Sequence, residues 1–181
     1  MIRLPKNTLY LTGLVGLLAC MWTGCSQAPD SVESAGAPSL DALFVEERPA
    51  NVMTVLQARE SVQPGDVVHI TGQIGGSTLP FAEGYAAFII ADESLVFCSE
   101  DPGDSCSTPW DACCESPEKI SASRAMVQFT DAVGNPVAIG LKGQNGLTEL
   151  DHVIVTGIVN AQSTAENLII DGQTLHLTAA E

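Results

Sequence analysis

Four cysteines lie close together in the middle of the chain, within residues 92–118. They are Cys98, Cys106, Cys113 and Cys114, and the same stretch holds eight acidic residues and neither lysine nor arginine. Cysteine thiolates prefer soft ions such as Cu(I) and Zn(II), and four of them could form a closed tetrahedral site. The spacing C-x7-C-x6-C-C lacks the C-x2-C pair that is typical of zinc sites, so zinc or copper binding is the alternative interpretation.

The first interpretation of these cysteines is two disulfide bonds. A 27-residue segment without secondary structure is unusual in a compact domain and needs a staple, a ligand or a function. Bridging the adjacent Cys113 and Cys114 to each other would strain the peptide, so we expect each of them to pair with Cys98 or Cys106. In this interpretation Trp110 covers the sulfurs.

The acidic residues of the same insertion suggest what it binds. The chain has 7 Lys and Arg against 22 Asp and Glu, a formal net charge of −15. Affinity for nucleic-acid phosphates comes from Lys and Arg, so nucleic acid is excluded as a partner. We expect Trp110, Asp101, Asp104 and Asp111 to contact a basic protein or a cationic ligand.

No motif in the sequence points to catalysis. The chain contains no G-x-S-x-G, no H-E-x-x-H and no phosphate-binding G-x-x-x-x-G-K-[ST], and it has no C-x-x-C redox pair. We therefore predict that the protein is not an enzyme and has no resident cofactor.

The first 25 residues are typical of an exported lipoprotein. Arg3 and Lys6 precede an uncharged apolar run at 9–19, which is too short to span a bilayer but suits a secretory signal. A small residue followed by cysteine then occurs twice, at Cys20 and Cys25. This start resembles the lipobox of bacterial lipoproteins, in which the cysteine becomes the lipidated N-terminus of the mature chain.

Cysteine parity favours Cys25 as the lipid anchor, with Cys20 as the alternative. Cleavage before Cys25 leaves an even number of cysteines in the body, although Leu17 fits the lipobox pattern better than Trp22 does. Removal of residues 1–24 leaves five basic against 22 acidic residues. Such a body would be repelled by an anionic membrane surface, so the lipid would hold the protein to the cell envelope, facing the periplasm or the cell surface.

The rest of the chain divides into a tether and one β domain. Residues 25–50 are rich in Ser, Ala, Pro and acids and read as a flexible acidic tether. Residues 51–181 form the domain, which starts with one short helix between Asn51 and Ser61. Apolar and β-branched runs then predict strands at 67–74, 86–91, 125–130, 137–141, 153–159, and 168–170 with 174–178.

These strands resemble the OB-fold, and most closely its small periplasmic BOF-type members. The resemblance covers residues 64–178 and rests on a first strand with interior Gly72, an echo of it with Gly157, and a second strand that ends at Ala91-Asp92. It implies a small barrel of five to six strands, mainly β, with a long Cys-rich loop insertion at 92–118. OB barrels bind ligands on one face and through their loops. We therefore expect a non-catalytic, lipid-anchored binding module, and alternatively a metal-handling lipoprotein.

Overall fold

The computed structural model describes residues 40–101, 103 and 105–178. The predicted signal peptide at 1–24 and both candidate lipid anchors, Cys20 and Cys25, lie outside the described residues. So does Asp104, one of the four residues expected to contact a partner.

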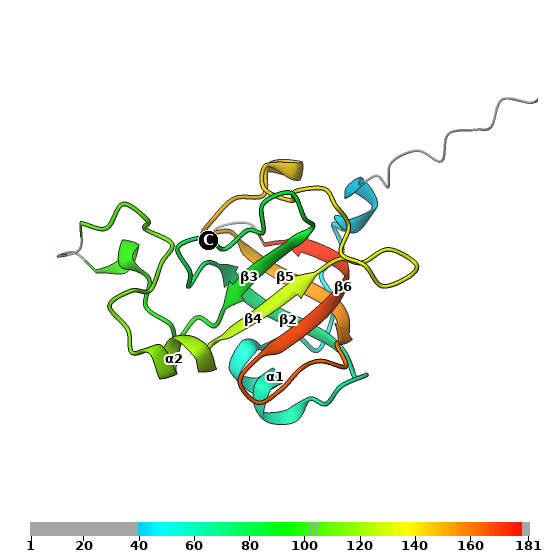
Figure 1. The fold of residues 1–181 in the computed structure, drawn as a ribbon, viewed down its shortest axis with the longest axis horizontal. Helices are drawn as coiled ribbons and strands as arrows, with labels where there is room; N and C mark the ends of the chain where they lie inside the picture. The colour runs from blue at the N-terminus through cyan, green and yellow to red at the C-terminus, as the bar shows by residue number, and fades with distance from the viewer. Residues whose placement is uncertain (1–39, 102, 104, 179–181) are drawn as a thin grey trace, which may run out of the picture. The chain divides into compact units, whose positions relative to one another are not determined.

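The described chain is mainly β, as predicted. Six strands form one sheet in the order β1-β2-β3-β4-β6-β5, and β2 also pairs with β5, which closes β2 to β6 into a five-stranded barrel (Figure 1). The strands are β1 (Met53–Thr54), β2 (Val67–Ile74), β3 (Ala87–Ala91), β4 (Arg124–Gln128), β5 (His152–Val159) and β6 (Leu168–Leu177). The helices are α1 (Val55–Ser61), α2 (Pro117–Ala122) and the 3-10 turns η1 (Leu40–Leu43), η2 (Cys98–Glu100) and η3 (Gln144–Gly146). The fold is therefore a small OB-like barrel with one extra strand.

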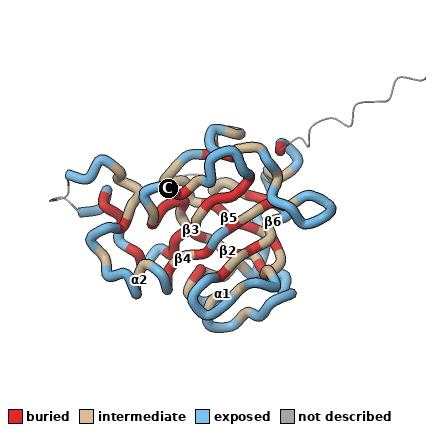
Figure 2. The backbone as a smooth tube through the Cα atoms, viewed as in Figure 1, coloured by how far each residue is buried: buried red, intermediate tan, exposed pale blue. Residues whose placement is uncertain are grey.

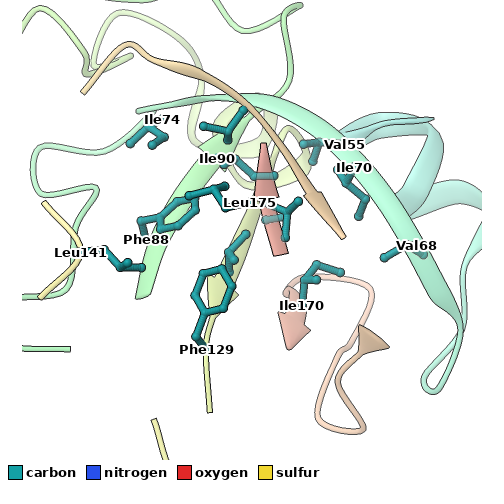
Figure 3. Packing of buried hydrophobic residues seen from close by; sticks show 14 of the residues in the cluster. Val55, Val68, Ile70, Ile74, Phe88, Ile90, Phe129, Leu141, Ile170 and Leu175 are labelled. Atoms are coloured by element: carbon teal, nitrogen blue, oxygen red, sulfur yellow. The ribbon is translucent and has the colours of Figure 1, made fainter. Parts of the chain in front are cut away.

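The barrel interior is filled by alternate residues of its strands. In β2 every second residue from Val68 to Ile74 is buried, as expected for a strand with one face on the core. Phe88, Phe129, Ile170 and other large side chains meet in the same core (Figure 3), and the burial follows the strands (Figure 2). Each such side chain, fully buried, contributes about 1.5–3 kcal/mol.

Strands β2 and β5 each carry a glycine where the backbone of a neighbouring strand comes close. A Cβ on Gly157 would lie 2.5 Å from the carbonyl oxygen of Asp171, and the β5–β6 register shifts between Thr156 and Gly157. Gly72 stands in the same relation to the Ala91 carbonyl oxygen, at 2.7 Å. The interior glycines therefore mark close approaches between strands.

Two predicted elements differ from the structure. The segment 137–141 is not a strand. Val137 still bonds to Phe129 and Ala86, but Ile139 donates to the Val137 carbonyl in a tight turn, which ends the pairing. The helix α1 begins at Val55, after a capping box of Thr54 and Gln57, and not directly after Asn51.

Part of the expected tether packs on the barrel. Leu40 is buried, Phe44 forms a bridge with Leu175 of β6, and the Val45 N–H donates to the Leu175 carbonyl at 2.9 Å. The domain therefore begins at least as early as Leu40, so the predicted boundary at Asn51 falls too late.

Asp92, at the start of the insertion, joins three parts of the fold. Its side chain is 5% exposed, one carboxylate oxygen accepts the Leu56 N–H of α1 at 2.9 Å, and the other accepts the Ser94 N–H at 3.1 Å. The Leu56 N–H is one of the helix-start donors that no carbonyl of the helix can reach. Burial alone raises the pKa of Asp92, but the hydrogen bonds from Leu56 and Ser94 outweigh it, so the pKa lies below its usual value.

We predict that Asp92→Asn destabilises the protein by about 1–3 kcal/mol at neutral pH, because an amide has one acceptor oxygen where the carboxylate uses two. The lowered pKa also means that Asp92 stabilises the fold fully above its ordinary pKa of 3.8 and loses this contribution as the pH falls through the folded-state value. Urea unfolding between pH 7 and pH 2.5 measures both effects. Asp92→Asn should flatten the acid limb, whereas the exposed neighbour change Glu93→Gln should leave it as in the wild type. An acid limb unaltered by Asp92→Asn would contradict this role.

Candidate functional site

The Cys-rich insertion is held against the barrel by a short backbone ladder. The segment 109–111 accepts hydrogen bonds on one side from Cys98 and Ser99, which donate to the carbonyls of Asp111 and Pro109 at 2.8 and 2.9 Å. On the other side, the N–H of Gly76 donates to the Trp110 carbonyl at 2.8 Å. Segments that are far apart in the sequence therefore lie side by side at the end of β2.

We call the contact of the segment 109–111 with Cys98, Ser99 and Gly76 the clamp. Side chains add further hydrogen bonds around it. The Trp110 indole N–H donates to the Thr78 carbonyl at 3.1 Å, and the Thr78 hydroxyl donates to the Asp111 carboxylate at 3.0 Å. Arg124, at the start of β4, donates from Nη1 to the Gly76 carbonyl at 2.8 Å. Both backbone groups of Gly76 are thus hydrogen-bonded, the N–H to the insertion and the carbonyl to β4.

The insertion also has a small core of its own. A second hydrophobic cluster forms from residues of β3, the insertion and the neighbouring loops: Ala91, Leu95, Phe97 and Ala112, with Ile120 and Leu150 packed against it. The helix α2, which the sequence analysis did not predict, follows with Ser116 as N-cap and Pro117 at its first position, both of which favour a helix start. A segment of this length is therefore ordered by packing and hydrogen bonds.

Three of the four cysteines come together on this scaffold. The Cys113 sulfur lies 3.5 Å from the Cys98 sulfur and 3.3 Å from the Cys106 sulfur, and the three sulfurs all lie within 4.8 Å of one another. Cys98 is 6% exposed, whereas Cys106 and Cys113 are exposed. We call Cys98, Cys106 and Cys113 the sulfur cluster. It could hold a metal ion.

The two disulfides expected from the sequence are not formed in the described part of the chain. The separations of Cys113 from Cys98 and from Cys106 both exceed the roughly 2.05 Å of a disulfide bond. Cys114 does not belong to the group of three. It lines a neighbouring cavity of about 220 Å³ together with Cys98, Asp101 and Glu115.

A carboxylate at this cavity is kept ionised by its neighbours. Glu115 accepts hydrogen bonds from the Lys119 ammonium and from the Val96 N–H at 3.4 Å. The hydrogen bond from Lys119 is the main reason that the pKa of Glu115 lies below its usual value. A cation that approaches the sulfur cluster through this cavity therefore meets an ionised carboxylate that is already paired with the Lys119 ammonium.

The structure describes three of the four residues predicted to contact a partner, Trp110, Asp101 and Asp111. Trp110, expected to cover the sulfurs, has its hydrogen bond on Thr78 and its ring 5.8 Å from the Lys142 ammonium, both on the barrel side. Asp111 is bonded to Thr78, and Asp101 accepts the Gly103 N–H at 2.9 Å. Trp110 and Asp111 thus act in the clamp, a role that their positions in the sequence do not reveal.

Ser116 and Lys119, at the start of α2, have structural roles. Residues 116–119 read S-x-x-K, which also occurs in serine–lysine enzymes. Here the Ser116 hydroxyl accepts the Lys119 N–H as the cap of α2, and the Lys119 ammonium contacts Glu115. These contacts make the pair a helix cap and an ion pair.

Comparison with models of known protein families finds no match for this chain, and a search of curated proteins finds none either. Among the helices of the described residues, none combines the length and the apolar character that a membrane crossing needs.

We predict that Gly75→Ala loosens the clamp and destabilises the protein by about 1–3 kcal/mol, because the added methyl overpacks a filled space. Its Cβ would lie 2.7 Å from the Trp110 carbonyl oxygen and 3.0 Å from the Phe97 ring. Trp110 is the one tryptophan after residue 24, so its fluorescence in a denaturant titration reports directly on this contact. The control is Gly140→Ala, where the nearest atom is 3.8 Å away. Equal stability of the two variants would show that the clamp tolerates displacement.

Proposed function

We propose that the protein is a non-catalytic, lipid-anchored protein of the cell envelope whose OB-like barrel carries a thiolate site for a soft metal ion, Cu(I) or Zn(II). The observation that supports the metal site is the position of Cys113, within 3.5 Å of both Cys98 and Cys106. A sulfur can bond to one partner in a disulfide, whereas a metal ion uses all three sulfurs at once. This favours metal handling over a loop stapled by two disulfides.

The spacing of the sulfurs suits one ion. Separations of 3.3 and 3.5 Å are less than twice the roughly 2.3 Å of a zinc–sulfur bond, so one ion can contact Cys113 and either neighbour without rearrangement. Three thiolates suit Cu(I), which prefers soft ligands, whereas structural Zn(II) takes four ligands. Zn(II) would need a water, a carboxylate or a shift of Cys114 as its fourth ligand.

The charge of the chain supports a cation as the ligand. With 22 acidic against 7 basic residues, the negative potential of the protein raises the local concentration of cations and of basic partner proteins. A protein partner that supplies or accepts the metal would therefore present a basic surface.

We predict that the reduced wild-type protein binds one Cu(I) ion and that Cys113→Ser lowers the affinity by more than about 100-fold, since loss of a second-shell group alone costs 10–100-fold. Competition with a chromogenic Cu(I) chelator under anaerobic conditions measures the affinity, and elemental analysis measures the stoichiometry. The matched control is Cys114→Ser, which removes the adjacent thiol outside the cluster and should bind as the wild type does. Equal losses in the two variants, or no Cu(I) or Zn(II) bound by the wild type, would contradict the proposal.

We predict that the mature chain begins at a lipidated Cys25. Intact mass and N-terminal fragmentation of the protein from a membrane fraction should show a diacylglyceryl group on this cysteine, and Cys25→Ser should shift the protein to the soluble fraction. Cys20→Ser should leave it in the membrane fraction. The reverse pattern would make Cys20 the anchor, and a mature chain without lipid would refute membrane anchoring by this route.

A further inference from the structure

The sulfur cluster is asymmetric in a way that metal binding does not require. Cys113 lies between two possible partners, at 3.3 Å from Cys106 and 3.5 Å from Cys98. Cys106 and Cys113 are exposed, whereas Cys98 is 6% exposed and fixed through its backbone N–H to Asp111. The central sulfur therefore has one partner open to solvent and one inside the fold.

We propose that the sulfur cluster is a thiol–disulfide exchange centre in which Cys113 forms alternative disulfides, first with Cys106 and then with Cys98. This inference goes beyond the proposed function and does not depend on a bound metal. A disulfide bond needs a sulfur separation of about 2.05 Å, so either bond requires the two sulfurs to close by roughly 1.5 Å or less. Rotation about the cysteine side-chain bonds can supply such a movement.

The first step needs an oxidant, which we take to be a low-molecular-weight disulfide such as oxidised glutathione. The thiolate of one exposed cysteine attacks a sulfur of the oxidant, forms a mixed disulfide and releases one thiolate of the oxidant. The second exposed cysteine then attacks the protein sulfur of the mixed disulfide and releases the other thiolate. In total, Cys106 and Cys113 lose two protons and two electrons, and the oxidant becomes two thiols.

The second step transfers the bond inward without a further oxidant. The Cys98 thiolate attacks the Cys113 sulfur, the Cys98–Cys113 bond forms, and Cys106 leaves as a thiolate that takes a proton from water. This exchange is a substitution at sulfur, so the number of disulfides stays the same. It moves the disulfide to the partly buried position and returns an exposed thiol.

Metal binding and oxidation then exclude each other, because both use Cys113. A metal ligand must be a thiolate, and a sulfur in a disulfide is no longer one. If the proposed metal site exists, two-electron oxidation of the cluster releases the ion.

The experiment treats the reduced, metal-free protein with oxidised glutathione, stops the reaction by alkylation at set times and maps the linked peptides by mass spectrometry. Cleavage at acidic residues separates Cys98, Cys106 and the adjacent pair Cys113-Cys114, because Asp101 and Asp111 lie between them. Fragmentation of the linked peptides between Cys113 and Cys114 then shows which cysteine of the pair carries the disulfide and which carries the alkyl group. We expect one disulfide, with a mass loss of about 2 Da, that links Cys113 to Cys106 at early times and to Cys98 later.

The variants separate the two steps. Cys98→Ser should stop at the Cys106–Cys113 bond, and Cys106→Ser should give the Cys98–Cys113 bond alone. Cys113→Ser should slow disulfide formation within the cluster by on the order of tenfold or more. Cys114→Ser should behave as the wild type, and circular dichroism of each variant checks that it folds.

A wild-type disulfide between Cys98 and Cys106, a disulfide through Cys114, or no intramolecular disulfide at all would overturn the exchange proposal. So would oxidation of Cys113→Ser at the wild-type rate. This experiment measures which cysteines are linked in the metal-free protein, so its result is independent of the metal-binding measurement. Failure to bind Cu(I) or Zn(II) would refute the proposed function and leave the exchange proposal to its own test.

Discussion

The contact between the segment 109–111 and the end of β2 is the interaction on which the candidate site depends. Gly75 has no side chain, so the Trp110 carbonyl and the Phe97 ring can occupy the space where a Cβ would stand. The ladder through Gly76 and Cys98 then sets the position of the insertion on both sides. Cys113 follows two residues after Asp111, and this places its sulfur beside Cys98. The geometry of the sulfur cluster thus derives from backbone hydrogen bonds, which exist before any metal or disulfide forms.

The barrel makes this contact possible because β2 pairs along two edges. It pairs with β5 over most of its length and with β3 only at its last residues, Gln73 and Ile74. The chain beyond β2 therefore continues beside β3, where Pro80 accepts the Ile89 N–H at 2.8 Å. Since β3 leads directly into the insertion at Asp92, the loop after β2 and the insertion begin as neighbours. A short local ladder is then enough to join them.

The sequence allows the barrel to be predicted better than the site. Alternating and β-branched runs predict β2 and β5 to within a residue, since their period follows from the burial of one face. The run at 137–141 is also apolar, but its backbone pairing stops at Val137, because Ile139 turns back and donates to the Val137 carbonyl. The sulfur cluster could not be predicted from the spacing C-x7-C-x6-C-C. Its geometry depends on the backbone hydrogen bond from the Cys98 N–H to the Asp111 carbonyl, which the spacing does not reveal. The separation of the adjacent Cys113 and Cys114 likewise depends on the turn in which they lie.

The surroundings of the sulfur cluster bear on both proposed reactions, metal binding and disulfide exchange. Glu115 is held ionised by Lys119, and its charge lies at the cavity that Cys98 and Cys114 also line. An oxidant should react first at Cys106 and Cys113, because these two sulfurs are exposed and Cys98 is buried. Burial of Cys98 then gives the cluster a direction, because a disulfide that moves inward is less open to attack by a second thiol. Position within the fold, rather than cysteine content, therefore determines which sulfur reacts first and which sulfur retains the bond.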